Sequence, residues 1–375
     1  MPFLTSSNPE TQTIIFGGLF ILLILALGFK KSADSLNLSL NKVSELKGLA
    51  ILMVIFSHVG YFLVPDNRFL VPLSGFGGVA VNLFLVLSGL GLTISQLKNP
   101  LSPIEFYKKR LLKIYIPAWF ALGIIIIAER LFLNLSYSTN EIVSSFSGFF
   151  PKANLYANLD SPFWYFTFLL IFYLIFPWVM KIKVKVLAPF ITLLIIFLLL
   201  IINWPSSFEV LGLYKIHFIA FPLGMLLATL AQTSLKNWTA KIFSSIYLKV
   251  LLAIASASIF VYFAVHSNVG NPATYLEQFS SLGTVIGILG LFFVINFESR
   301  FLKIFGEYSY ETFLLHWPIM LRFDFLYKTL PTGLATFIYI PFLLGVSSLF
   351  RRLVDFIVPK ISAVTDALTK HKIKG

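Results

Sequence analysis

Long apolar runs dominate this chain, and each is long enough to cross a lipid bilayer as a helix. A segment that crosses the bilayer is helical, because its backbone polar groups must be hydrogen-bonded inside the protein, and it needs about 20 mostly apolar residues to span a hydrocarbon core of about 30 Å. Eleven such runs follow one another with short linkers between them. Their approximate bounds are 13–29, 46–64, 77–97, 111–133, 162–180, 186–203, 214–231, 247–266, 279–297, 305–325 and 333–357. The sequence therefore predicts an all-α, polytopic bundle of about eleven transmembrane helices.

The composition agrees with a membrane protein and excludes several other classes. Only 12% of the 375 residues are charged, whereas soluble domains carry about 25%. The chain has no cysteine, so it forms no disulfide, thiolate metal site or cysteine nucleophile. Its net charge of +13 would suit nucleic acid in a soluble protein, but in a membrane protein the placement of the charges matters more. We therefore expect the lipid bilayer, and not nucleic acid, as the surrounding partner.

The distribution of lysine and arginine predicts the orientation. Cytoplasmic loops of membrane proteins carry an excess of these residues. With the N-terminus outside and eleven alternating spans, 23 of the 29 basic residues fall on the inner side. The outer side keeps Arg68, Arg130, Lys152, Lys215, Arg322 and Lys328. We therefore expect a multi-pass protein of the cytoplasmic membrane with an external N-terminus and a cytoplasmic C-terminus.

The short linkers predict one main domain with two extensions. A membrane domain is expected over 41–360, preceded by an additional span and linker over 1–40. A basic cytoplasmic tail is expected over 361–375. The run at 13–29 does not read as a cleaved signal peptide, because its charges follow the apolar core instead of preceding it.

The stretch "ELKGLAILMVIFSHVGYF", residues 45–62, carries a histidine deep inside an apolar run. Lys47 and His58 are eleven residues apart, about three helical turns, so both lie on one helix face. His58 is then about 16 Å from Lys47, near the middle of the bilayer, and Glu45 lies beside Lys47 at the cytoplasmic end. Ionisable groups inside a membrane are functional candidates. A neutral His58 that hydrogen-bonds a neighbouring helix fits the sequence equally well.

His316 is the second candidate, in "GEYSYETFLLHWPIM", with Glu311 five residues before it. Interhelical hydrogen bonding is again the alternative interpretation. The remaining histidines rank lower. His217 and His266 lie near outer helix ends, where polar groups cost little, and His371 lies in the tail.

Two further polar segments enter the predicted spans. Asn82 is costly to expose to lipid, so we expect it to face the interior of the bundle, while Ser88 and Gly89 permit close helix approach. The segment "FYKKRLLKIYIPAW" either anchors the chain at the inner surface or holds a phosphate-rich cytosolic donor. Its basic residues are Lys108, Lys109, Arg110 and Lys113. No Walker-type glycine loop and no metal-ligand spacing are present, so no metal site is predicted.

Five motifs in the same order resemble those of the membrane acyltransferases of family 3, which O-acylate surface glycans. The resemblance runs from about residue 44 to residue 359. The motifs are "LKGLAILMVIFSH", "VNLFLVLSGLGLT", "FYKKRLLKIYIPAW", "PFWYFTFLLIFYLIFP" and "GEYSYETFLLHWPI".

The resemblance implies an acyl-CoA donor, most often acetyl-CoA, that binds from the cytosol with its phosphates on the basic segment 108–113. It implies His58 as general base or acyl carrier, with Lys47 and Glu45 setting donor position or local charge. The acceptor would be a glycan or lipid-linked sugar at the outer face. The remaining polar and aromatic residues of these segments would bind substrate or support the site: Asn82, Ser88, Trp164, Tyr173, Ser309, Tyr310 and His316.

The chain departs from the family pattern in several places, among them Lys108, which replaces one arginine of an Arg-x-Arg pair while Arg110 keeps the other. Lys47 stands where the family usually has arginine, and so loses a bidentate fork. Residues 169–171 are Leu-Leu-Ile, where many members have Glu-Glu-Gln. The family core usually has ten spans, so the run at 13–29 is additional.

A transporter or flippase is the rival interpretation. It would use the buried polar residues His58, Asn82 and His316 as its site. The absence of an internal repeat in the sequence and the five ordered motifs argue against it.

Overall fold

The computed structural model describes residues 6–31, 40–64, 68–152, 163–233, 245–267, 274–295 and 297–372. The charges predict the side of the membrane on which each terminus lies, but residues 1–5 and 373–375 are outside the described part. Within it the chain is almost wholly helical, which confirms the prediction of an all-α polytopic bundle.

The first half of the chain alternates long helices with short connecting turns. Its elements are α1 (Pro9–Leu27), β1 (Phe29–Lys31), α2 (Leu40–Ser57), η1 (His58–Leu63), η2 (Leu73–Phe76), α3 (Gly77–Lys98), α4 (Pro103–Arg110), η3 (Leu111–Tyr115), α5 (Ile116–Leu133), α6 (Thr139–Ser147) and α7 (Trp164–Val179). The second half contains α8 (Leu187–Ile201), α9 (Leu211–His217), α10 (Ala220–Thr233), α12 (Ile246–His266), α13 (Thr274–Val294), β2 (Phe297–Ser299), α14 (Arg300–Glu307), α15 (Ser309–Arg322), α16 (Phe325–Thr329) and α17 (Thr332–Lys372).

Among the described residues, eight helical stretches are long and apolar enough to cross a membrane. Three of the eleven predicted runs form shorter helices: α7, α8 and α15, with 16, 15 and 14 residues. At 1.5 Å per residue these are about 21–24 Å long, less than the roughly 30 Å of a hydrocarbon core. The count of eleven therefore stays a prediction. The predicted domain boundaries also remain untested, and α17 continues across the one at residue 360.

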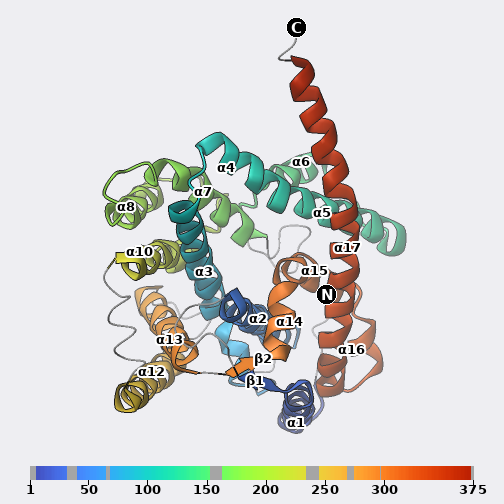
Figure 1. The fold of residues 1–375 in the computed structure, drawn as a ribbon. Helices are drawn as coiled ribbons and strands as arrows, with labels where there is room; N and C mark the ends of the chain where they lie inside the picture. Colours follow the sequence, from blue (N-terminus) through green and yellow to red (C-terminus); the bar gives the residue numbers. More distant parts are fainter. Residues whose placement is uncertain are drawn as a thin grey trace.

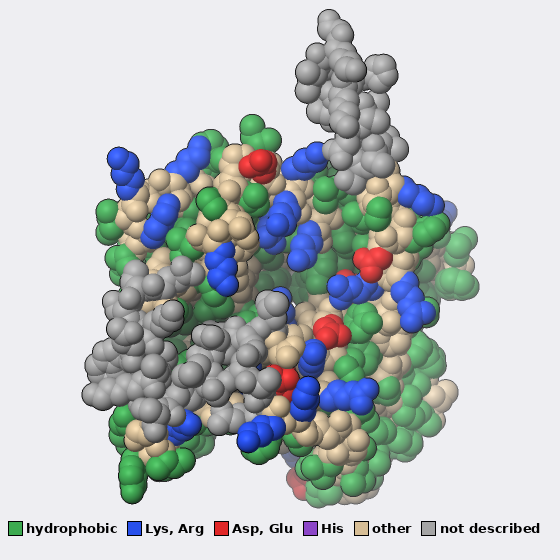
Figure 2. Space-filling model, viewed as in Figure 1, with side chains coloured by type: hydrophobic (Ala, Val, Ile, Leu, Met, Phe, Trp, Pro, Cys, Tyr) green, Lys and Arg blue, Asp and Glu red, His purple; other side chains and the backbone are tan. Residues whose placement is uncertain are grey.

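Figure 1 shows α2, α3 and α14 in the middle of the bundle, with α8, α10, α12 and α13 on one side. The long helix α17 lies on the other side, together with α16 and α1. The elements α4, α14 and the strand pair lie toward the viewer (Figure 1), and Figure 2 shows lysine and arginine side chains gathered on this face. The charge-based orientation assigns the same elements to the cytoplasmic side.

Glycine residues bring α3 and α10 into backbone contact. A Cβ at Gly89 would lie 2.2 Å from the carbonyl oxygen of Phe221, and one at Gly224 would lie 2.0 Å from that of Val86. Small residues permit this approach in membranes, where packing drives helix association. The close approach predicted at Ser88-Gly89 is thus confirmed, with α10 as the partner helix.

The same arrangement joins α2 to α14. A Cβ at Gly48 would lie 1.9 Å from the carbonyl oxygen of Leu302, and one at Gly306 would lie 1.7 Å from that of Ser44. Since α2 carries Lys47 and leads into His58, this contact fixes the helix on which both candidate residues lie.

The additional first span is attached to the bundle at both ends. The backbone N–H of Gly333 in α17 donates to Gln12 Oε1 of α1 at 3.0 Å. At the other end of α1, β1 pairs antiparallel with β2, and Phe29 lies opposite Ser299. The sequence did not predict this strand pair, because three residues per strand are too few for a periodic signal.

Replacing Gly89 by alanine should lower the melting temperature, because the new Cβ would lie 2.2 Å from a backbone oxygen of α10. Overpacking of this kind costs about 1–3 kcal/mol. Gly91→Ala is the matched control on α3, since nothing lies within 4 Å of its Cβ position and alanine is the better helix former. Thermal unfolding of the detergent-solubilised protein measures both, and equal melting temperatures would contradict the backbone contact.

Candidate functional site

The structure brings His58 and His316 into direct contact. His58 Nδ1 lies 2.8 Å from His316 Nε2, and the two rings are nearly parallel, with centroids 4.9 Å apart. His316 is fully buried and His58 is half-buried. His58 also begins the π-helical segment η1, and such segments occur frequently at functional sites.

The surroundings of His316 fix the proton positions of a neutral pair. His316 Nδ1 lies 2.9 Å from the carbonyl oxygen of Phe313 and 3.2 Å from that of Thr312. A carbonyl oxygen only accepts, so Nδ1 carries the proton and Nε2 holds a lone pair. His58 Nδ1 must then donate to His316 Nε2. The remaining nitrogen, His58 Nε2, therefore holds a lone pair and can act as a base or a nucleophile.

Two aromatic residues complete the surroundings of this pair. The hydroxyl of Tyr339, in α17, donates to the backbone carbonyl oxygen of His316. The Trp317 ring lies 5.0 Å from the His58 ring. The pair is thus held by three helices, α2, α15 and α17. From the sequence the two histidines were separate candidates, because 258 positions divide them.

A group of positive charges, which we call the basic cluster, converges near the start of α2. Lys47 lies within electrostatic range of Arg110 and Lys113. Arg351, in α17, also acts on Lys113, and the sequence interpretation missed it. Lys108 and Lys109 extend this group as exposed side chains of α4. Figure 2 shows a hollow in the same face, bordered by lysine and arginine side chains.

Arg110 is held in a defined position by two aromatic rings. Its guanidinium carbon lies 5.4 Å from the ring centre of Phe106 and 5.8 Å from that of Tyr173, at distances typical of cation–π contacts. Arg110 Nε is buried and has no hydrogen-bond partner among the described residues. A buried donor of a charged group without a partner is costly, so this nitrogen is suited to an anionic ligand.

Polar residues of the second, fourth and last motifs lie around the basic cluster and in the helix that follows α14. Ser88 Oγ lies 3.0 Å from the hydroxyl of Tyr173. The Tyr310 hydroxyl donates to the carbonyl oxygen of Ile114 at 2.6 Å and so ties α15 to η3, the segment that carries Lys113. Ser309 Oγ donates to the carbonyl oxygen of Gly306 at 3.0 Å, a contact within its own turn.

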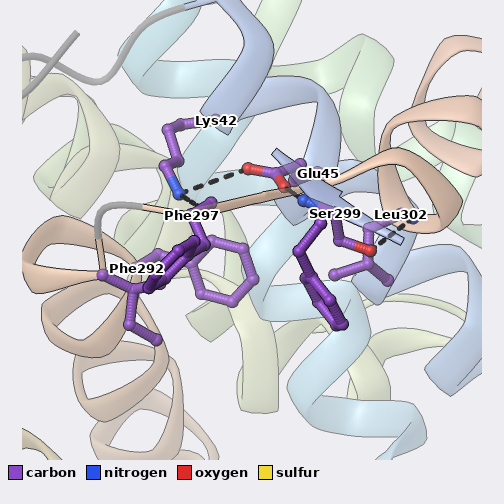
Figure 3. Close-up of a pocket in the computed structure, with 8 residues that line it drawn as sticks. Lys42, Glu45, Phe292, Phe297, Ser299 and Leu302 are labelled. Atoms are coloured by element: carbon purple, nitrogen blue, oxygen red, sulfur yellow. Dashed lines mark hydrogen bonds and ion pairs between the residues drawn. The ribbon is translucent and has the colours of Figure 1, made fainter. Parts of the chain in front are cut away.

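The structure turns Glu45 away from the side of α2 that carries Lys47. Figure 3 shows the Glu45 carboxylate beside a cavity of about 400 Å³, where it pairs with Lys42 at 3.5 Å and accepts from the backbone N–H of Ser299. The reason is helical geometry, since two residues correspond to about 200° of rotation. Glu45 and Lys47 therefore point to opposite sides of α2.

Asn82 faces the interior of the bundle, as predicted, but away from the histidine pair. Its Oδ1 lies 2.9 Å from His217 Nδ1, and its Nδ2 donates to Ser281 Oγ at 2.7 Å. The indole of Trp164 stacks on His217 with centroids 5.8 Å apart. The set of His58, Asn82 and His316 that a transporter would use is thus divided between two places. Among the described residues, no group of three His, Asp or Glu side chains is arranged to hold a metal ion.

A family model described as an acyltransferase domain, of acyltransferase family 3, matches residues 43–352 of this chain. The match covers more than half of the chain and leaves out the additional first span. The comparisons with curated proteins and with solved structures gave no match.

Glu45→Gln should lower the free energy of unfolding, because it leaves the buried ammonium of Lys42 without its carboxylate. Breaking a buried ion pair costs about 3–5 kcal/mol. The double variant Lys42→Met/Glu45→Gln should recover most of that loss, since both charges are then gone. Thermal unfolding of the single and double variants measures the effect, and a single variant as stable as wild type would exclude a structural ion pair.

Proposed function

Because the chain belongs to membrane acyltransferase family 3, we propose that it transfers an acyl group, with acetyl as the expected group, from cytosolic acyl-CoA to a hydroxyl group of a cell-surface or lipid-linked glycan. The protein is an integral, multi-pass membrane acyltransferase. The observation that carries the proposal is the hydrogen bond between His58 and His316, which leaves a lone pair on His58 Nε2 inside the bundle.

The basic cluster is the expected donor site. CoA carries several phosphate groups, and arginine and lysine bind phosphate through charge-assisted hydrogen bonds. Arg110, positioned by Phe106 and Tyr173, has a donor to offer, and Lys47 and Lys113 add positive charge beside it. Lys47 is about 16 Å from His58 along α2. The extended pantetheine arm of CoA suits that separation between phosphates and thioester.

His58 Nε2 can promote transfer in either of two ways. As a general base it removes the proton of the acceptor hydroxyl while the oxygen attacks the thioester carbon. The carbon–sulfur bond breaks, and the imidazolium returns the proton to the departing thiolate. As a nucleophile, Nε2 attacks the thioester carbon itself, the carbon–sulfur bond breaks, and the imidazole holds the acyl group until the hydroxyl displaces it. The hydroxyl proton then goes to the thiolate.

His316 is a positioning residue in both routes. Its Nε2 accepts from His58 Nδ1, so it holds the tautomer in which His58 Nε2 is free of a proton. When His58 becomes positively charged, the same hydrogen bond stabilises the imidazolium. The carbonyl oxygens of Phe313 and Thr312 keep the His316 ring in the orientation that this role requires.

Arg110→Ala should weaken the binding of acetyl-CoA by roughly tenfold or more, since charge-assisted hydrogen bonds contribute about 1.5–3 kcal/mol. Isothermal titration calorimetry of the purified protein measures the Kd, and affinity should fall as salt rises. Lys98→Ala is the control, because it removes one exposed charge at the C-terminal end of α3, outside the basic cluster as defined above. Equal losses of acetyl-CoA affinity in the two variants would mean that the basic cluster attracts the donor only through its general positive charge.

His58→Ala and His58→Gln should each lower transfer by about 10²–10⁴-fold, because neither side chain takes a proton at neutral pH. His316→Gln should retain more activity than His316→Leu, since a glutamine oxygen can still accept from His58 Nδ1. Free CoA is measured with a thiol reagent in membranes that contain the acceptor, and the protein adds no background because it has no cysteine.

Acetyl-CoA affinity and melting temperature of the same histidine variants serve as controls, and both should stay close to wild type for His58→Gln. Near-normal transfer by His58→Gln would refute the assignment of His58.

A further inference from the structure

A second set of buried polar residues lies apart from the histidine pair and the basic cluster. Its members come from α3, α9 and α13, none is more than 6% exposed, and α7 adds an indole at its side. We call this set the outer polar cluster. It consists of Asn82, His217, Glu277, Gln278 and Ser281, with Trp164 stacked on His217.

The hydrogen bonds of the outer polar cluster fix the proton of His217. Ser281 Oγ donates to the carbonyl oxygen of Gln278 at 3.2 Å, so it accepts from Asn82 Nδ2. Asn82 Oδ1 then faces His217 Nδ1 at 2.9 Å and accepts its proton. A neutral His217 therefore keeps a lone pair on Nε2, available to a hydroxyl donor.

Two further polar groups have no partner among the described residues. Glu277 is 6% exposed, and its carboxylate forms no hydrogen bond or ion pair with another described side chain or backbone group. Gln278 Nε2 is buried and unpaired in the same sense. Burying polar groups without hydrogen bonds is costly, so a donor and an acceptor side by side indicate a site whose partner is a ligand.

Gly78 lies next to both Glu277 and His217. A Cβ placed on Gly78 would lie 3.6 Å from Glu277 Oε1 and 3.7 Å from His217 Cε1. The carboxylate and the imidazole thus flank one position on α3, and Gly78 itself is partly exposed. Trp164, half-buried, offers an aromatic face at the edge of the same position.

The outer polar cluster lies at the opposite end of the bundle from the basic cluster. Trp164 is the first residue of α7, His217 the last of α9, and Glu277 lies in the first turn of α13. The charge-based orientation places these helix ends outside. Ring contacts of 5.5–6.4 Å lead from Trp164 through Tyr165 and Phe313 to His316.

We propose that the outer polar cluster is the acceptor subsite and binds a sugar residue that carries no negative charge, either neutral or with an amino group. Glu277, Gln278 and His217 supply acceptors and a donor for hydroxyl groups, and Trp164 supplies a face for the apolar side of the sugar ring. Uronic acids and phosphorylated sugars are excluded, because the outer polar cluster contains no lysine or arginine that could pair with a further buried anion beside Glu277. This inference rests on the proposed function.

The test is the retention of the purified, detergent-solubilised protein on an array of neutral, amino and acidic oligosaccharides. Wild type should bind neutral or amino glycans and not acidic ones. Glu277→Ala should weaken that binding roughly tenfold or more. Glu277→Gln should keep neutral glycans and weaken the binding of amino glycans, because it preserves the hydrogen-bonding shape but cannot form an ion pair with an ammonium group.

Gly78→Leu should block the site, and Gly91→Leu, on the same helix with open space at its Cβ, is its control. Melting temperatures identify any variant that fails to fold. If the alanine or leucine variant does not fold, the comparison of glycan binding by wild type and Glu277→Gln decides. Retention of no glycan, of acidic glycans only, or equally by wild type and Glu277→Ala would overturn the proposal.

Acetyl-CoA binding is measured separately on the same preparations. If the protein binds glycans but not acetyl-CoA, the donor proposal is contradicted and the acceptor subsite remains supported. If it binds acetyl-CoA but no glycan, the acceptor subsite is contradicted and the donor proposal remains supported.

Discussion

A lipid bilayer offers no hydrogen-bond partners, and this constraint decides where the polar side chains of the chain lie. Inside a span, a polar side chain is stable when it meets another group of the protein or a bound ligand. His58 meets His316 and Asn82 meets His217. The helices that lead to His58 and carry Asn82 are also held by backbone contacts at glycine, because only a missing side chain lets α2 reach α14 and α3 reach α10 so closely.

Three polar places follow one another through the bundle. The basic cluster lies at the start of α2, the histidine pair lies at the end of that helix, and the outer polar cluster lies where α7 and α13 begin. Under the proposed function, a donor with phosphate groups and an acceptor with hydroxyl groups would need different surroundings, positive in one case and hydrogen-bonding in the other. The basic cluster and the outer polar cluster differ in this way, and the histidine pair lies between them.

Much of the fold and part of the site could be predicted from the sequence. Run lengths predicted the helical membrane bundle, and the eleven-residue spacing placed Lys47 and His58 on one helix face, since both signals are local. The contact between His58 and His316, the contribution of Arg351 to the basic cluster and the grouping of Glu277 with His217 join distant segments, so no local period reveals them. Glu45, expected beside Lys47, lies about half a turn away from it around α2 and pairs with Lys42.

The helix α3 has a property that follows from its backbone contact with α10. It carries Asn82 at the outer polar cluster and Ser88 beside Tyr173 and Arg110, and the two positions are about 9 Å apart along the axis. With no side chain between α3 and α10 at Gly89 and Gly224, a relative shift of the two helices would bring backbone atoms together, so we expect them to move as one body. Under the proposed function, the distance along α3 between the acceptor site and the donor site would then stay constant. An opening that admits a substrate would have to come from other helices.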